Sequence, residues 1–130
     1  MKKSVLVTVC VTLGLIATAA WAGGKTGAEV YADSAGRYAY GALGSARNSA
    51  DAVQYIGCYV YAYSSGSEYV GCFARNAAGT YVSCVSSVPQ IINTVRGLNE
   101  NGYLYFTYDA GGTCSYVEAR NVSYFPPLLP

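Results

Sequence analysis

The sequence of 130 residues contains no histidine, and only 12% of its residues are charged. Histidine is the commonest general base and the one side chain that normally titrates near neutral pH, so the familiar hydrolase triads are excluded. No two of the seven acidic residues have a spacing that indicates a pair of carboxyl groups held across a cleft, which a glycosidase requires. We therefore expect a protein without catalytic activity, cofactor or metal ion, with an unusual hydrolase as the alternative.

Basic residues are also few, and they are scattered along the chain. Binding to a nucleic-acid duplex requires a cluster of basic side chains that displaces counterions from the phosphates. We therefore expect no nucleic-acid partner.

Residues 1–22 have the three parts of an export signal. Lys2 and Lys3 give the charged start, residues 5–20 form an apolar run, and residues 20–22 (Ala-Trp-Ala) form a cleavage site with small residues at both ends. We expect a secreted or periplasmic protein that has no stable membrane insertion once the signal is removed. A retained membrane anchor is the alternative.

Four cysteines follow the expected cleavage site, and an even number in an exported chain indicates two disulfide bonds. A zinc site is the alternative, but the spacing contains none of the Cys-x-x-Cys pairs that are typical of one. The four residues are Cys58, Cys72, Cys84 and Cys114.

The domain after the signal reads as mainly β. Residues 23–36 are rich in glycine and alanine and predict a flexible N-terminal segment with at most one short strand near Val30. Residues 37–125 predict a single β-rich domain, and residues 126–130 a proline-rich tail that cannot continue a strand ladder. Aromatic and β-branched runs separated by turn residues predict antiparallel strands at 37–45, 53–63, 68–76, 80–86, 103–109 and 113–120, with a turn at 47–51.

One segment departs from strand alternation and predicts a short helix near 88–98. Ser87 is a candidate N-cap and Pro89 suits a first helical turn. The apolar residues that follow recur at helical spacing, and they are Ile91, Ile92, Val95 and Leu98. The resulting element order is three strands, a helix and two strands, preceded by one strand at 37–45. It is consistent with a small antiparallel sheet or a barrel.

A local motif predicts the strand register. An aromatic, a branched and a small residue precede cysteine at 55–58, 69–72 and 81–84. Three-residue hairpin loops at 64–66 and 77–79 would set Cys58 opposite Cys72, and Cys72 opposite Cys84. Strands two apart in a sheet are separated by about 10 Å, too far for a disulfide bond. We favour Cys58–Cys72 with Cys84–Cys114, and the alternative is Cys72–Cys84 with Cys58–Cys114.

This register places cysteines and branched residues on one side of the sheet and bulky rings on the other. The ring-bearing side is our candidate ligand-binding surface, because such a face exceeds the apolar area that soluble monomers usually expose. Alternatively, these rings pack against the remaining strands, where Tyr103, Tyr105, Tyr108 and Tyr116 would cover them. The candidate residues are Tyr59, Tyr61, Tyr63, Tyr69, Phe73, Arg75 and Tyr81, together with Tyr55 in the same row as Arg75.

Arg75 lies between Tyr55 and Tyr81 in this register. Its guanidinium could stack on those rings, or it could anchor an anionic group of a ligand.

Three segments, together with the Lys-Lys signal, carry a resemblance: Gly44–Asp51, Gln54–Cys58 and Asn101–Phe106. They resemble a group of short exported bacterial proteins that has no assigned activity, and the resemblance implies bacterial secretion only. The element order is similar to that of the OB-fold, a small barrel that secreted bacterial proteins use to bind glycans or proteins. The extra strand at 37–45 departs from that pattern, and a helix on an open sheet is the alternative.

From these observations we expect a secreted, disulfide-stabilised, non-catalytic binding module whose tyrosine-rich face holds a carbohydrate or a protein surface. One alternative is a structural envelope or matrix protein that assembles by pairing strands between copies. Another is an inhibitor of a lytic enzyme or protease that inserts the loop at 64–67. The sequence alone sets no oligomeric state.

Overall fold

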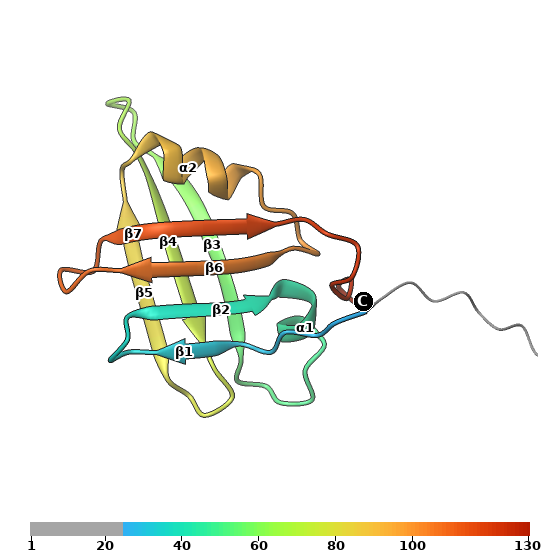
Figure 1. Cartoon of the computed structure of the whole chain (residues 1–130). Helices are drawn as coiled ribbons and strands as arrows, with labels where there is room; N and C mark the ends of the chain where they lie inside the picture. The colour runs from blue at the N-terminus through green and yellow to red at the C-terminus, as the bar shows by residue number, and fades with distance from the viewer. Residues whose placement is uncertain (1–24) are drawn as a thin grey trace, which may run out of the picture.

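The computed structural model describes residues 25–130, so the expected export signal at residues 1–22 lies outside the described residues. Two antiparallel sheets pack face to face, and their strands cross rather than run alongside one another (Figure 1). One sheet has the strand order β1-β2-β6-β7 and the other β3-β4-β5. The elements are β1 (Tyr31–Asp33), β2 (Tyr38–Ala42), α1 (Leu43–Arg47), β3 (Tyr55–Ala62), β4 (Glu68–Arg75), β5 (Tyr81–Ser86), α2 (Pro89–Arg96), β6 (Tyr103–Tyr108) and β7 (Cys114–Arg120).

The expected mainly β fold is confirmed, including the order of three strands, a helix and two strands, here β3-β4-β5-α2-β6-β7. Within residues 25–130 the strands form two separate sheets and close no barrel. No helix in this part of the chain is long and apolar enough to span a membrane.

Three hairpins use the same turn. In each, five residues separate the two strands, and the middle three form a loop whose last residue is a glycine with positive φ, namely Gly66 (91°), Gly79 (88°) and Gly112 (81°). The first loop is closed by a hydrogen bond from the Tyr63 N–H to the Ser67 carbonyl (2.8 Å). The second is closed in the same way from Asn76 to Thr80 (3.1 Å). Glycine adopts this left-handed backbone without strain, so the turn chemistry sets the register.

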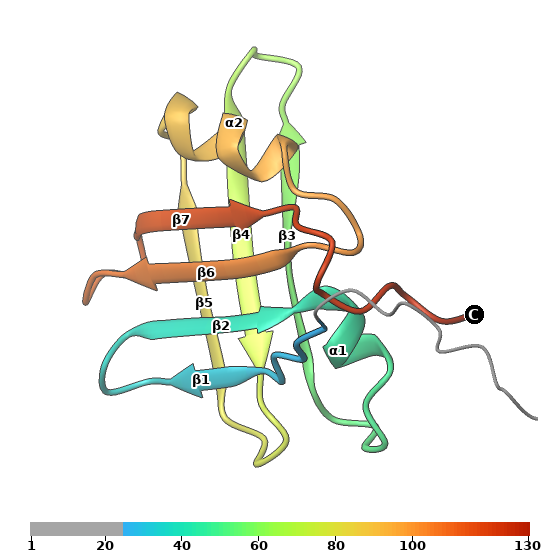
Figure 2. The same cartoon turned by 45° about the vertical axis from the view of Figure 1, so that its right-hand side comes forward.

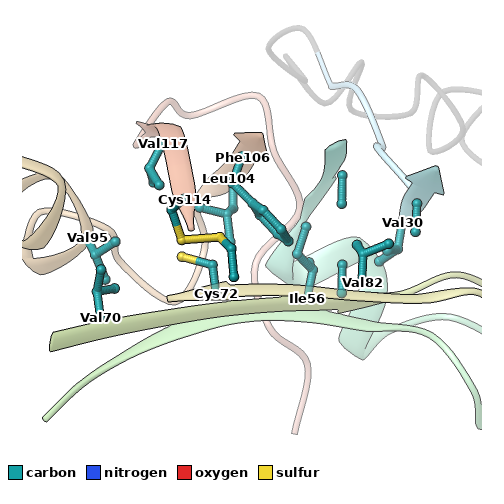
Figure 3. Close-up of a cluster of buried hydrophobic side chains, with 14 of the residues drawn as sticks. Val30, Ile56, Val70, Cys72, Val82, Val95, Leu104, Phe106, Cys114 and Val117 are labelled. Atoms are coloured by element: carbon teal, nitrogen blue, oxygen red, sulfur yellow. A yellow bond between two sulfur atoms is a disulfide. The ribbon is translucent and has the colours of Figure 1, made fainter. Parts of the chain in front are cut away.

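The predicted register of the three-stranded sheet is confirmed, because Cys58 pairs with Cys72 and Cys72 pairs with Cys84. The cysteine-bearing side faces the other sheet and forms the core. Phe106 and Leu104 of β6 are fully buried against it (Figure 3).

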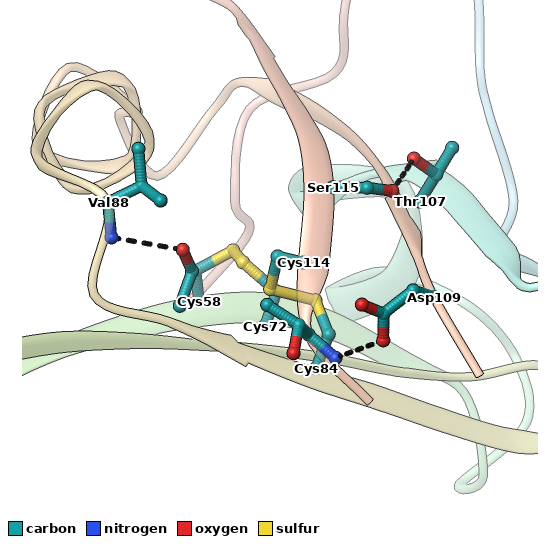
Figure 4. The surroundings of a disulfide bond; sticks show 10 residues. Cys58, Cys72, Cys84, Val88, Thr107, Asp109, Cys114 and Ser115 are labelled. Carbon is teal, nitrogen blue, oxygen red and sulfur yellow. Dashed lines mark hydrogen bonds between the residues drawn. A yellow bond between two sulfur atoms is a disulfide. The ribbon is translucent and has the colours of Figure 1, made fainter. Parts of the chain in front are cut away.

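The favoured disulfide pairing is also confirmed, and the alternative pairing is wrong. Cys58–Cys72 joins two strands of one sheet, whereas Cys84–Cys114 joins β5 to β7 and so links the two sheets (Figure 4).

The helix α2 lies over the core at one end of the three-stranded sheet, beside β7 (Figure 2). Ile92 and Val95 are buried, as their spacing predicted. The expected cap at Ser87 is wrong, because the N-cap residue is Val88. The Val88 N–H donates to the hydroxyl of Ser86 (3.1 Å). Ser86 is the last residue of β5, and its side chain is buried.

The sheet begins earlier than expected. The strand β1 lies inside the segment 23–36 that we expected to be flexible, at the position allowed for one short strand. Val30 and Ala32 are buried, and the Val30 N–H donates to the side-chain oxygen of Gln54 (3.0 Å). Part of this glycine-rich segment therefore belongs to the folded domain.

The strand expected at 37–45 ends at Ala42, and α1 replaces its last residues and the start of the expected turn. The helix α1 packs tightly on the C-terminal segment, since a Cβ atom at Gly44 would lie 1.9 Å from the Pro126 carbonyl oxygen. The tail forms no strand, as predicted, but it is held by hydrogen bonds such as that from the Leu128 N–H to Asn101 Oδ1 (2.9 Å).

Candidate functional site

The candidate rings of the three-stranded sheet face solvent. We call this surface the first aromatic face and define it by Tyr55, Tyr59, Tyr61, Tyr63, Tyr69 and Phe73. All six lie on the side of β3 and β4, or of the turn between them, that is opposite to the core. The exposed fractions of Tyr59 and Tyr63 are 53% and 60%. The alternative, in which the remaining strands cover these rings, is therefore wrong.

The rings of the first aromatic face form one continuous row. The centroids of Tyr61 and Tyr69 are 5.5 Å apart with an interplanar angle of 20°. Tyr59 extends the row to Phe73 (6.0 Å), and Phe73 extends it to Tyr55 (5.8 Å). At the other end the Tyr63 ring is nearly perpendicular to the rings of Tyr61 and Tyr69. Such offset and edge contacts are favourable between aromatic rings, so the rings hold one another in place.

Two glycines in the sheet make room for the rings. Tyr59 pairs with Gly71 across the strands, and a Cβ atom at Gly71 would lie 2.6 Å from Cζ of Tyr59. Phe73 pairs with Gly57 in the same way, with its ring 3.7 Å from the equivalent position. The Tyr59 ring therefore lies across β4, and since more than half of the residue is exposed, its outer surface is open.

Arg75 and Tyr81 stand apart from this row. The register sets Arg75 between Tyr55 and Tyr81, as predicted. However, its guanidinium reaches toward the turn at Gly79, where Nη2 is 3.7 Å from the position of an added Cβ atom. The cation that lies over a ring within residues 25–130 is instead Arg120, 5.2 Å from the centroid of Tyr103. The expected stacking of Arg75 is therefore wrong, because its side chain turns to the neighbouring loop.

The first aromatic face carries little charge. Glu68 on β4 points to the other side, where it forms an ion pair with Arg96 of α2. Partial burial raises the pKa of Tyr61, and the neighbouring phenols raise it further. These phenols belong to Tyr63, Tyr59 and Tyr69. The Tyr61 hydroxyl stays protonated at neutral pH and can both donate and accept hydrogen bonds.

The four-stranded sheet carries a second ring-bearing surface that sequence reasoning missed. We call it the second aromatic face, and it consists of Tyr31, Tyr38, Tyr40, Tyr103, Tyr105 and Tyr116. Tyr31 and Tyr40 stack with centroids 5.3 Å apart, and Tyr40 and Tyr105 with centroids 6.4 Å apart. The alternation of Tyr38 with Tyr40, and of Tyr103 with Tyr105, was the signal that could have revealed it.

The second aromatic face differs from the first in its charge. Glu118 and Arg120 of β7 form an ion pair there, and hydrogen bonding to Arg120 lowers the pKa of the Glu118 carboxyl. A hydrogen bond with Tyr31, together with partial burial, raises the pKa of Tyr38 to about 12.

A cleft of about 400 Å³ lies beside the start of β3. Part of its wall is apolar, and part is charged, with one basic residue (Arg47) and two acidic ones (Asp51 and Glu100). The apolar part comes from Leu43 and Ala46 of α1, Ile56 of β3 and Leu128 of the tail. No sequence pattern indicated this cleft, because its walls come from segments that are far apart in the chain.

Comparison with protein-family models, curated proteins and solved structures gives no match for this chain. We therefore infer the function from the geometry of these surfaces.

Proposed function

We propose that this protein is a non-catalytic binding module that holds a neutral carbohydrate chain on the first aromatic face. The observation that carries the proposal is the row of six rings, in which the Tyr59 ring lies over Gly71 and more than half of the residue is exposed. An aromatic ring offers a large apolar surface at a low entropic cost, and a tyrosine adds a hydroxyl for hydrogen bonds.

The size of the row favours an extended ligand. From Tyr55 to Tyr63 the strand advances eight residues, which is about 27 Å at about 3.4 Å per residue. Each large ring presents on the order of 150–250 Å² when free, and soluble monomers seldom leave several such rings together uncovered. A chain of several sugar units would cover the row, whereas a single sugar would cover one or two rings.

The chemistry of the face favours a neutral ligand. Arg75 is the one charged side chain on this side of the three-stranded sheet, and it turns to the loop at Gly79. An acidic polymer would need several cations, and a basic one several carboxylates. A neutral sugar needs apolar ring surface and hydroxyl groups, which the face has.

The setting agrees with a role outside the cytoplasm. Two disulfide bonds indicate folding in an oxidising compartment. Export through the signal at residues 1–22, with release to the periplasm or beyond the cell, is part of this proposal.

The test is binding to a panel of soluble neutral polysaccharides, measured by calorimetry and by a glycan array. The variant Tyr61→Ala with Tyr69→Ala removes the two stacked rings at the centre of the row, and we expect its affinity to fall by about 10-fold or more. The matched control is Tyr40→Ala with Tyr105→Ala, which removes a similarly stacked pair from the second aromatic face. Equal loss in both variants, or no loss in the first, contradicts the proposal.

A further inference from the structure

Four strand edges are present in the two sheets, and three of them are protected. The strand β1 is only three residues long, and β7 carries the ion pair of Glu118 and Arg120. The edge of β5 is covered by the β6–β7 turn, because the Val85 N–H donates to the Gly112 carbonyl (3.0 Å). The edge of β3 has eight residues with no charge, no proline and an unbroken register. Short length, charge and coverage are the usual means of blocking an edge. The strand β3 is neither short nor charged, and α1 lies beside its start at Tyr55 and Ile56.

The geometry of the disulfide bond identifies the backbone groups that this edge offers. Cys58 and Cys72 are paired with Cα atoms 4.1 Å apart, the close spacing of a pair that exchanges no ladder hydrogen bonds. The N–H and carbonyl groups of Cys58 therefore point away from β4, and by alternation so do those of Val60 and Ala62. In the described part of the chain, no other segment donates to or accepts from these three residues. Cys58 and Val60 are partly exposed, and Ala62 is exposed.

The cleft beside α1 lies at the start of this free edge, since Tyr55 and Ile56 of β3 form part of its wall. The outward backbone groups and a cleft of about 400 Å³ with partly apolar walls therefore lie on the same strand. Strand addition uses this combination, in which main-chain hydrogen bonds give affinity and a side-chain pocket gives specificity.

We infer that the free edge of β3 binds an extended peptide segment of another protein by strand addition, with one large apolar side chain seated in the cleft beside α1. The added strand continues the order as peptide-β3-β4-β5. Alternate peptide side chains point to the ring side, beside Tyr59 and Tyr61, so β-branched and uncharged residues suit those positions.

The surroundings of the edge favour a single peptide over a second copy of this chain. Both views show α1 and the C-terminal segment lying past β3, on its side away from β4 (Figures 1 and 2). A second copy that paired through its own β3 would bring the same projecting elements to the same place. A lone extended segment carries no such elements.

The inference does not depend on carbohydrate binding, because it uses the edge of β3 rather than its ring-bearing side. The probe is a set of end-blocked eight-residue peptides with threonine and valine in alternation, in which one position is glycine, leucine or phenylalanine. Binding is followed by NMR amide shifts and by hydrogen exchange on the full domain with both disulfides intact. We expect slower exchange at the amides of Cys58, Val60 and Ala62, with no change at Ser83 on β5. Burial of the leucine or phenylalanine side chain should make those peptides about 10-fold or more tighter than the glycine peptide.

Two variants separate the edge from the cleft. Ala62→Pro removes an outward N–H that the β3–β4 ladder does not use, and we expect this variant to lose peptide binding. The control Ala62→Ser keeps the N–H, and we expect it to bind the peptide as the wild-type protein does. Ala52→Leu fills the cleft from an exposed position and should remove the advantage of the apolar peptides. If Ala62→Pro does not fold, the exchange pattern of the wild-type protein decides.

The inference is overturned if no peptide slows exchange at the three amides, if Ala62→Pro folds and still binds, or if glycine and leucine peptides bind equally. Protection of the same amides by self-association, seen as a rise of mass with concentration in sedimentation, also overturns it in favour of a second copy. Loss of carbohydrate binding in the Tyr61 and Tyr69 variant leaves it unaffected.

Discussion

Removal of the disulfide bond between the sheets should destabilise the protein more than removal of the bond within one sheet. In the chain-entropy model the sequence separations of 14 and 30 correspond to about 3.0 kcal/mol for Cys58–Cys72 and about 3.6 kcal/mol for Cys84–Cys114. Packing adds to the difference, because Cys84 and Cys114 are both buried while Cys58 is only partly so. Each buried sulfur replaced by hydrogen costs about 1 kcal/mol. The totals are about 5.5 kcal/mol for the bond between the sheets and about 4 to 4.5 kcal/mol for the bond within one sheet.

The variants are Cys84→Ala with Cys114→Ala, and Cys58→Ala with Cys72→Ala. Domains of this size have free energies of unfolding of about 5–15 kcal/mol, so the first variant approaches the limit of stability and the second keeps a larger margin. Urea unfolding followed by circular dichroism measures both free energies. The remaining hairpin hydrogen bonds still hold β3 to β4 in the second variant, whereas β5 and β7 lose their covalent link in the first. An equal or larger loss in the Cys58 and Cys72 variant would refute this reasoning.

Two further predictions follow from single positions. Gly71→Ala places a Cβ atom 2.6 Å from the Tyr59 ring and should displace that ring from β4. We expect weaker carbohydrate binding, with a change in the free energy of unfolding within about 1 kcal/mol. Unaltered carbohydrate binding would contradict the proposed role of the first aromatic face. Hydrogen bonds, first from the Gln54 side chain, lower the pKa of Asp51 to about 2 from its ordinary value of 3.8. The stabilisation from this carboxylate is complete above about pH 4 and is lost as the pH falls toward 2. Asp51→Asn should therefore reduce the dependence of the free energy of unfolding on pH in this range. An acid-unfolding profile identical to that of the wild-type protein would contradict this prediction.

Much of the three-stranded sheet was predictable because several local signals agreed. The spacing of the motif that ends in Cys58, Cys72 and Cys84, together with glycine in the third position of each loop, allows only one register. That register sorts rings from branched side chains, and it limits the disulfide pairing to two possibilities.

Features that depend on contacts between distant segments were not predictable. The short helix α1 forms where Gly44 meets Pro126, and no periodicity in its five residues indicates a helix. The strand register places Arg75 but does not determine whether its guanidinium lies over the neighbouring rings or beside the turn at Gly79. The second aromatic face was missed for a different reason, since Tyr103 and Tyr105 were considered only in the alternative in which they cover the first face.

All 14 tyrosines of the chain lie between residues 31 and 124, while its single tryptophan is Trp21, before the described domain. The near-ultraviolet absorbance and emission of residues 25–130 therefore come mainly from phenol rings, most of which lie on two opposite outer surfaces. A molecule that binds to either surface changes the surroundings of several of these chromophores at once. Binding can therefore be followed through tyrosine absorbance and emission, without an added label.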